Sequence, residues 1–193
     1  ERIKQKTRIS IVNWEKQRKQ LRSGKYTITD MLNHSDNFIT YKAEDREGNL
    51  FVVKTLSDRL LASPNREDFK NKLLAEGAKL SEFKNHSNIV KVEEFFLEND
   101  TVCVVMEYVS GRNLAQISQD LPLPEKKALS YVCQIGQALA VVHARGVVHR
   151  DVKRENIVLT GTGARAVLID FDLARNFNHP LTTQAKPSAE SEG

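Results

Sequence analysis

The chain contains His149-Arg150-Asp151-Val152-Lys153-Arg154-Glu155-Asn156-Ile157-Val158-Leu159, followed closely by Leu168-Ile169-Asp170-Phe171-Asp172. Both stretches place ionisable side chains beside apolar runs, which is how a strand end holds polar groups over a cleft. The residue types suit phosphoryl transfer. An Asp can accept a hydroxyl proton, a Lys can neutralise phosphate charge, and Asn and Asp oxygens can bind Mg²⁺. We expect these groups to be Asp151, Lys153, Asn156 and Asp170.

The composition is that of an ordinary globular protein. The 193 residues, 40% hydrophobic and 28% charged, are enough for one well-buried domain. Residues 1–25 hold nine Lys or Arg against two Glu, so the net charge of +4 describes a segment and we expect no nucleic-acid partner. No apolar run reaches the ~18 residues of a membrane span and no signal peptide is recognisable, so a cytoplasmic location is expected. Cys103 and Cys133 lie in apolar runs and are predicted to be buried, reduced thiols.

The first half of the chain shows a helical segment and then strand patterns. Residues 8–22 predict a short basic amphipathic helix that covers the main domain; a membrane or nucleic-acid contact is the alternative. Strands are predicted at 26–28, 38–41, 50–54, 89–97 and 102–107, with one helix at 64–84. Together these elements predict a small antiparallel sheet with a helix packed on it.

The second half is more helical. Pro122 and Pro124 mark the start of a helix that ends at Arg145-Gly146, where glycine suits a left-handed cap. Its predicted apolar stripe is Ala128, Val132, Ile135, Leu139 and Val142. Short strands are predicted at 147–148, 157–159 and 167–169, the last two joined at 161–163. Residues 178–193 lack periodicity and are predicted to be disordered.

Glu76 lies in the apolar stripe of the helix predicted at 64–84. A carboxylate on such a face is unfavourable unless a cation meets it, and Lys54, which closes an apolar strand, is the expected partner. The alternative is that Glu76 sits at the edge of the stripe and reaches water. The other members of the stripe are Phe69, Leu73, Leu80 and Phe83.

The stretches at 149–159 and 168–172 resemble the catalytic loop and metal-binding motif of eukaryotic-like Ser/Thr protein kinases. Several residue types match in order, which makes the resemblance specific. The order Lys54, Glu76, Asp151, Asn156, Asp170 is also that family's order. The run Thr40-Tyr41-Lys42-Ala43 is more similar to bacterial members, cyanobacterial ones among them, than to animal members.

The resemblance implies an α+β, protein-kinase-like fold with a five-stranded antiparallel small lobe, one small-lobe helix and a partial helical large lobe. It divides the chain into a basic extension at 1–24, the small lobe and hinge at 25–109, the partial large lobe at 110–177 and a tail at 178–193. It covers residues 25–177. Without it, Asp151 would be read as a turn or helix-cap acid, and residues 104–109 as an ordinary strand and turn.

The resemblance also implies ATP and Mg²⁺ as ligands and assigns roles to residues. Lys54 and Glu76 would position ATP, Asp151 would orient or deprotonate the acceptor hydroxyl, and Lys153 would offset charge. Asn156 and Asp170 would hold Mg²⁺, while His149 would pack in a column with Phe171 and Leu80 rather than act as a base. The residues expected to contact the nucleotide are Lys54, Val52, Met106 as the gatekeeper, Glu107, Val109 and Val158.

Three departures from the family pattern stand out. The loop expected to be glycine-rich holds Asn33, Ser35 and Phe38 at its glycine places, so side chains would crowd the triphosphate. Asp172 replaces the glycine of the Asp-Phe-Gly motif, and Arg154 stands where proline is common. The activation segment and later helices have no counterpart. Apolar surface on the helix 125–144 should therefore be exposed. Either the chain is a fragment, or a partner protein supplies the missing surface.

The leading functional hypothesis is a protein Ser/Thr kinase-like domain that transfers the γ-phosphoryl group of ATP to a protein hydroxyl, with weak activity in this chain. The alternative is a pseudokinase that acts as a binding module. A small-molecule phosphotransferase is a third hypothesis, and it is less consistent with Arg150 because those relatives usually have glycine between the His and the Asp.

Overall fold

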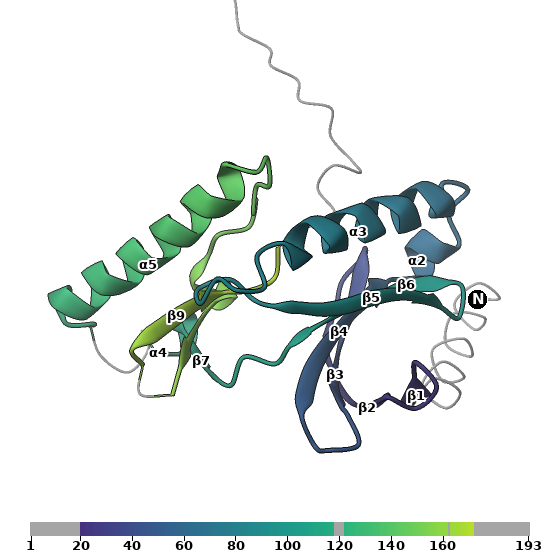
Figure 1. The fold of residues 1–193 in the computed structure, drawn as a ribbon, viewed down its shortest axis with the longest axis horizontal. Helices are drawn as coiled ribbons and strands as arrows, with labels where there is room; N and C mark the ends of the chain where they lie inside the picture. The colour runs from purple at the N-terminus through teal and green to yellow at the C-terminus, as the bar shows by residue number, and fades with distance from the viewer. Residues whose placement is uncertain (1–19, 118–121, 162, 172–193) are drawn as a thin grey trace, which may run out of the picture.

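The computed structural model describes residues 20–117, 122–161 and 163–171. It contains two antiparallel sheets, each with helices packed against it, and the chain passes from the larger sheet to the smaller one after Glu107 (Figure 1). Most of the helix predicted at 8–22, Asp172 and the predicted tail lie outside the described residues. Among the described residues, no helix combines the length and apolar composition needed to cross a membrane.

The larger sheet has six antiparallel strands in the order β1-β2-β3-β4-β6-β5. Along β3 and β4, successive residues point to opposite faces, so each strand contributes to two buried clusters. The strands are β1 Gln20–Leu21, β2 Tyr26–His34, β3 Phe38–Glu44, β4 Leu50–Leu56, β5 Val92–Glu98 and β6 Thr101–Glu107.

This sheet curls until its two edges meet. The hydroxyl of buried Tyr26, in β2, donates a 2.5 Å hydrogen bond to Glu94, in the opposite edge strand β5. Glu94 also accepts a 2.5 Å bond from Lys25, and the Arg22 guanidinium lies over the Phe96 ring at 5.0 Å. Beside these edge contacts lies a buried apolar cluster that contains Leu21 of β1, Tyr26 of β2 and residues of β3, β4, β5 and β6.

Two helices follow β4: α2 Asp58–Leu61 and α3 Arg66–Ser81. The α3 helix packs against β5 and β6, with Leu73 and Leu80 fully buried in the second and larger cluster. The predicted α+β kinase-like fold is confirmed, while the strand count differs because the two-residue β1 adds a sixth strand. Leu21, predicted to be helical, pairs instead with Tyr26 in that hairpin.

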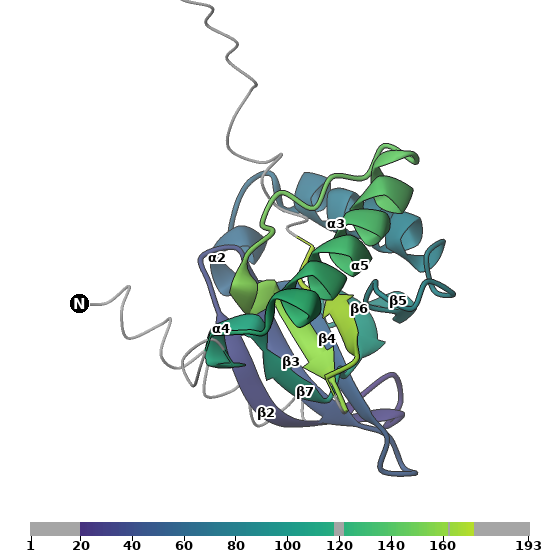
Figure 2. The same ribbon diagram turned by 90° about the vertical axis from the view of Figure 1, so that its left-hand side faces the viewer.

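The smaller sheet has the order β7-β8-β9, formed by Gly111–Asn113, Ile157–Thr160 and Arg165–Leu168. The short α4, Leu114–Ile117, follows β7, and α5, Glu125–His143, packs along β9 (Figure 2). A single 3₁₀ turn, η1 Arg154–Asn156, precedes β8. The predicted hairpin through residues 161–163 is confirmed by the β8–β9 pairing.

The buried stripe of α5 differs from the predicted one, because Tyr131 and Ala138 are buried in place of Val132 and Leu139. Its members are Tyr131, Ile135, Ala138 and Val142. Val132 is 68% exposed and Leu129 is 61% exposed, which agrees with the expectation that apolar surface on this helix faces outward. Cys103 is buried as predicted, but Cys133 is exposed because it lies on the other side of α5 from the stripe.

The strand predicted at 147–148 is absent from the described structure. Gly146 adopts φ +72° as the expected left-handed helix cap, and the amide of Val147 then donates to the carbonyl of Val142. That bond belongs to the helix end, so Val147 does not join a sheet. The strand predicted from Ile89 begins at Val92, since Ile89 forms an isolated bridge with Leu168 instead.

The segment between α3 and β5 joins the two sheets. Asn88 donates 2.7 Å and 2.8 Å hydrogen bonds to the Ala166 carbonyl and to Gln134 of α5. The Leu168 amide donates to Asn88, and the Val90 amide donates to Leu168. These buried bonds fix where β9 ends relative to the larger sheet, and therefore where the residues after β9 lie.

Replacing Glu94 by Gln tests the edge contacts of the larger sheet. Burial alone would raise the pKa of Glu94, but hydrogen bonds from Lys25 and Tyr26 outweigh it and lower that pKa below its ordinary 4.5. The carboxylate therefore stabilises the fold above pH 4.5, and this contribution disappears as the pH falls through the lowered value.

We expect Glu94→Gln to reduce the free energy of unfolding by about 1 kcal/mol at neutral pH, measured by urea denaturation. The difference from the wild type should vanish in acid. The matched control is Glu93→Gln, which removes an exposed ion pair with Lys91 and should have a smaller effect. A Glu94→Gln effect that is equal at neutral and acid pH would contradict this assignment.

Candidate active site

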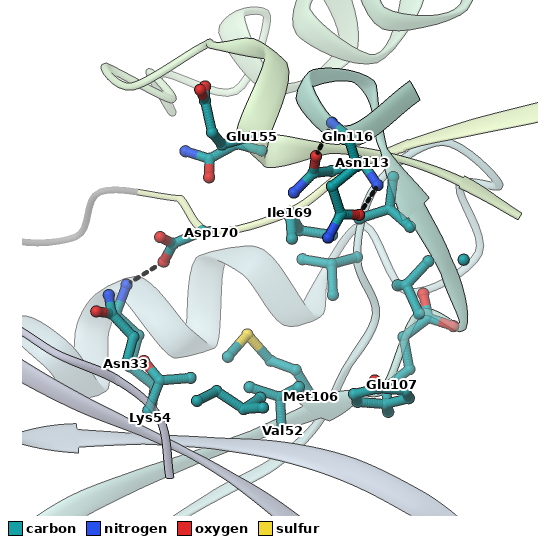
Figure 3. A pocket seen from close by; sticks show the side chains of 18 residues that line it. Asn33, Val52, Lys54, Met106, Glu107, Asn113, Gln116, Glu155, Ile169 and Asp170 are labelled. Carbon is teal, nitrogen blue, oxygen red and sulfur yellow. Dashed lines mark hydrogen bonds and ion pairs between the residues drawn. The ribbon is translucent and has the colours of Figure 1, made fainter. Parts of the chain in front are cut away.

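A cavity of about 540 Å³ lies between the two sheets (Figure 3). On the side of the larger sheet, with the hinge at residues 106–109, the cavity is lined by Leu32, Asn33, Thr40, Val52, Lys54, Val90, Met106, Glu107, Tyr108 and Val109. On the side of the smaller sheet it is lined by Gly111, Asn113, Gln116, Glu155, Asn156, Val158, Ile169 and Asp170. All of the residues predicted to contact the nucleotide, and both predicted metal ligands, line this one cavity. Glu76, Asp151 and Lys153 are outside its lining.

The hinge end of the cavity is built from backbone. The β6 strand ends at Glu107, whose side chain accepts a 2.9 Å bond from the Lys91 amide and whose own amide donates to the Lys91 carbonyl. The amide of Tyr108 donates to Leu50. The Glu107 side chain and the amides of Glu107 and Tyr108 are therefore engaged within the protein and fix the course of the chain at this end of the cavity.

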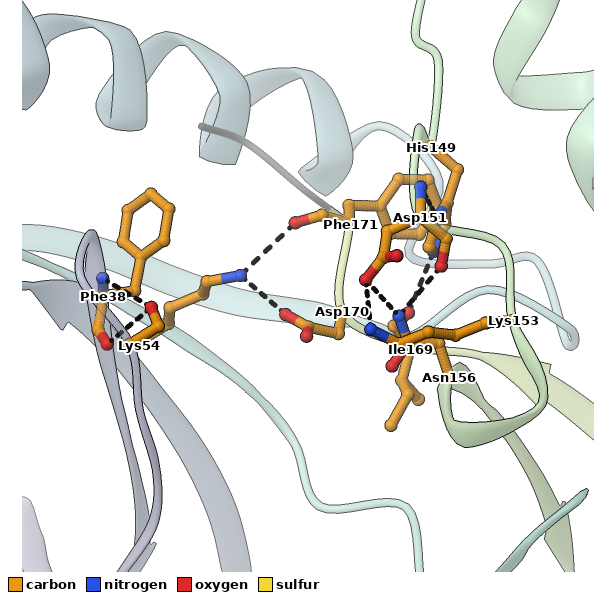
Figure 4. A network of polar contacts seen from close by, with 10 residues as sticks. Phe38, Lys54, His149, Asp151, Lys153, Asn156, Ile169, Asp170 and Phe171 are labelled. Atoms are coloured by element: carbon orange, nitrogen blue, oxygen red, sulfur yellow. Dashed lines mark hydrogen bonds and ion pairs between the residues drawn. The ribbon is translucent and has the colours of Figure 1, made fainter. Parts of the chain in front are cut away.

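Lys54 occupies the middle of the cavity wall. It is 5% exposed, and its ammonium lies 2.6 Å from Asp170 Oδ1, 3.4 Å from the Phe171 carbonyl oxygen and 4.8 Å from the centre of the Phe38 ring (Figure 4). Lys54, the expected partner of Glu76, is thus in contact with Asp170. Glu76 itself is half-buried on α3. A pair between Lys54 and Glu76 stays a prediction.

The catalytic-loop residues form a compact network. Asp151 accepts a 3.0 Å bond from the Asn156 amide and a 2.7 Å ion pair from Lys153. Asn156 also donates to the Asp151 carbonyl at 2.9 Å. The hydrogen bond that Lys153 donates to the Asp151 carboxylate raises the pKa of Lys153, so Lys153 is a cation at neutral pH. A backbone bond links this loop to the stretch at 168–172, because the Ile169 amide donates to the Asn156 carbonyl at 2.9 Å.

His149 holds two unusual backbone positions together. Arg150 and Asp170 have φ of 66° and 54°, a region that residues other than glycine seldom adopt. Strained conformations of this kind persist where surrounding contacts fix them. The His149 ring contacts both sides: Nε2 lies 2.9 Å from the Ile169 carbonyl, and Nδ1 accepts from the Asp151 amide at 3.3 Å.

The same contacts define the state of the His149 ring. It is fully buried and tilted against Phe171, with ring centres 4.4 Å apart. Burial lowers the pKa of His149, and the Ile169 carbonyl only partly opposes this. A neutral ring that donates from Nε2 and accepts at Nδ1 satisfies both neighbours. The structure thus places His149 as a packing and positioning group beside Phe171.

Asn156 and Asp170 present a donor set that suits a divalent cation. Both line the cavity, and Mg²⁺ is bound by carboxylate and amide oxygens together with phosphate oxygens. Asn156 uses its amide nitrogen on Asp151, so its amide oxygen is the atom that would bind the ion. The residues therefore fit the expected ion.

Sequence reasoning missed several lining residues. Asn113 and Gln116 bond reciprocally, each side-chain oxygen accepting the other's amide at 2.9 Å, and this fixes the start of α4 at the cavity edge. The spacing Asn-x-x-Gln is a helix-start pattern that could have indicated α4. Glu155 and Ile169, which adjoin predicted ligands, had no signal of their own beyond that proximity.

Comparisons with known proteins agree with this geometry. The family model described as the protein kinase domain matches residues 39–189. The chain is 33% identical over 131 residues to the serine/threonine-protein kinase pkn2 of Myxococcus xanthus, and 31% identical over 156 residues to a probable serine/threonine-protein kinase of Clostridium perfringens. These alignments cover 66% and 80% of this chain. The chain belongs to the protein kinase family.

Solved structures give the same fold. The kinase domain of Mycobacterium tuberculosis PknI matches with a TM-score of 0.61 and 27% identity, covering 81% of this chain and 62% of that one. Rad53 residues 1–466 in complex with AMP-PNP matches with a TM-score of 0.66 and 25% identity, covering 79% and 40%. The chain spans only 15% and 22% of the lengths of the two curated relatives named above.

Replacing His149 by Gln tests the state of the His149 ring. The pKa of His149 is lowered from 6.5 in the folded protein, so the unfolded chain binds more protons as the pH falls below 6.5. The stabilisation that comes from keeping His149 neutral is complete above pH 6.5 and is lost as the pH falls toward the lowered pKa of His149. We expect the wild type to lose stability from neutral pH to about pH 5 by more than His149→Gln does, measured by urea denaturation.

His143→Gln, at the exposed C-terminal end of α5, is the control and should retain the wild-type pH dependence. Equal pH dependence in the wild type and His149→Gln would contradict a buried neutral ring.

Proposed function

We propose that this chain binds ATP with Mg²⁺ in the cavity between the two sheets and transfers the γ-phosphoryl group to a Ser or Thr hydroxyl of a protein. The observation that carries the proposal is the convergence of hinge backbone, Lys54, Asn156 and Asp170 on one cavity, with Asp151 hydrogen-bonded to Asn156 at its edge. The arrangement supplies a cation for phosphate, oxygens for a metal and a carboxylate for the acceptor hydroxyl.

Each residue has a distinct task in this proposal. The hinge between Met106 and Val109 orients the base, and Lys54 is released from Asp170 to meet the phosphates. Mg²⁺, when bound by Asn156 and Asp170, neutralises charge on the phosphate oxygens. Asp151 holds the acceptor hydroxyl in line and accepts its proton, while Lys153 offsets the developing charge.

The activity of this chain alone is proposed to be weak. Leu129 and Val132 present apolar surface on α5, and a protein partner or substrate that needs a complete large-lobe surface would not find it among the described residues. The second candidate is a binding module without phosphotransfer, favoured by the engagement of Lys54 with Asp170 and Phe171. In that case a partner protein would bind the exposed α5 face.

Thermal unfolding with Mg-ATP tests nucleotide binding. A ligand that binds only the folded state at ten times its Kd stabilises the protein by about 1.4 kcal/mol, which raises Tm. We expect this shift in the wild type and in Asp151→Asn, and a smaller shift in Lys54→Met, because the hinge contacts remain. Lys79→Met, on the exposed face of α3, is the matched control and should behave as the wild type. Absence of a shift at millimolar Mg-ATP would contradict the proposal.

Phosphate transfer from labelled ATP to a generic Ser/Thr substrate tests the chemistry. We expect slow transfer in the wild type and a loss of at least ~100-fold in Asp151→Asn, because a positioned base contributes typically 10²–10⁴-fold. Nucleotide binding without any transfer that depends on Asp151 would favour the binding module. Rapid transfer by this chain alone would contradict weak activity.

A further inference from the structure

The strand register locates the end of the cavity that is farthest from the hinge. Along β4, Val52 pairs with Met106 next to the hinge, and Lys54 pairs with Thr40 further along. The next residue of β4 on the same face is Leu56, and it pairs with Phe38. Phe38 therefore lies beyond Lys54, where the phosphate chain of a nucleotide bound at the hinge would extend.

The Phe38 side chain packs beside Lys54, beyond the cavity lining. It is 6% exposed and belongs to the buried cluster that contains Leu56 and Leu60. Its ring lies against the Lys54 ammonium, 4.8 Å from ring centre to nitrogen, and Figure 4 shows it on the side of Lys54 away from Asp170. A glycine at this position would leave that volume open. The cavity lining accordingly includes Thr40 and Asn33 but none of residues 34–38.

The turn before Phe38 uses its own amide groups internally. The Ser35 amide donates to the Phe38 carbonyl at 2.9 Å, and the Phe38 amide donates to Ser35 Oγ at 3.1 Å. Residues 33–38, all of them described, have no positive φ, so the turn closes without glycine. A phosphate-binding loop works by directing free amide groups at the anion. Two of the amides in this turn are already committed.

The turn is also anchored from behind. Ser57, which is 2% exposed, donates its hydroxyl to the Asp36 carbonyl at 2.6 Å and its amide to the Asn37 carbonyl at 2.9 Å. The same hydroxyl accepts from Leu60 as the N-cap of α2. Asp36 adds an exposed ion pair with Arg59 at 2.9 Å, a contact of small energy. The buried Ser57 bonds therefore hold the turn and Phe38 in one arrangement.

We propose that Phe38 and the Ser35 turn narrow the phosphate end of the site, so that it recognises mainly the nucleoside part of its ligand and gains little affinity from the triphosphate. This inference rests on the proposed nucleotide function and specifies which part of the ligand is recognised. Binding energy comes from the hinge and the residues around Asn113, while Lys54 is shared among Asp170, Phe171 and the Phe38 ring.

Calorimetric titration with adenosine and with ATP, both in the presence of Mg²⁺, tests the inference. In the wild type we expect the two dissociation constants to differ by less than about tenfold, which corresponds to 1.4 kcal/mol. Ser35→Gly removes the acceptor of the Phe38 amide, and Phe38→Gly removes the ring. At least one of them should increase the preference for ATP over adenosine by about fivefold or more, with adenosine affinity nearly unchanged.

Ser35 is exposed, so Ser35→Gly keeps the test usable if loss of the buried Phe38 ring unfolds the protein. The matched control is Glu47→Gly, in the turn at the other end of β3, which should leave both affinities unchanged. A wild-type preference for ATP of tenfold or more, or no gain in either variant, overturns the inference while leaving the nucleotide site in place. Failure of both ligands to bind overturns the proposed function and this inference with it.

Discussion

The contact between Lys54 and Asp170 connects the two halves of the site. Lys54 comes from the centre of the larger sheet, Asp170 follows the last strand of the smaller one, and their 2.6 Å ion pair spans the cavity. The Lys54 side chain is almost fully buried, and a buried ammonium is stable only with a partner. Because the partner is also a proposed metal ligand, any ligand that carries phosphate and a cation must compete for both groups.

Several contacts fix the position of the backbone at Asp170. The Asn88 bonds fix β9 against the larger sheet, and β9 leads directly to Ile169 and Asp170. The His149 ring then holds the Ile169 carbonyl and the Asp151 amide, next to the two residues with positive φ. Residues 149–156 and 168–171 are thereby fixed relative to each other by contacts within the protein.

Apolar periodicity, a local signal, predicted the antiparallel sheet with a helix packed on it, and the resemblance to the kinase family implied the residues that line the cavity. Sequence reasoning missed features that depend on long-range packing. Tyr131 and Ala138 are buried on α5 in place of the predicted Val132 and Leu139, and Val147 ends a helix because the Gly146 cap uses its amide. The missing glycines were visible in the sequence. The Ser57 anchor and the position of Phe38 over Lys54 required the register of β3 on β4.

The dependence of nucleotide binding on Mg²⁺ tests the proposed role of Asp170, because it separates the contribution of Asp170 from that of the rest of the cavity. Titration of a non-hydrolysable ATP analogue into the wild type should give tighter binding with Mg²⁺ than without it. In Asp170→Asn this gain from Mg²⁺ should disappear, while binding without Mg²⁺ persists through the hinge. An equal gain from Mg²⁺ in the wild type and in Asp170→Asn would contradict the assignment of Asp170, and with it the account of the site.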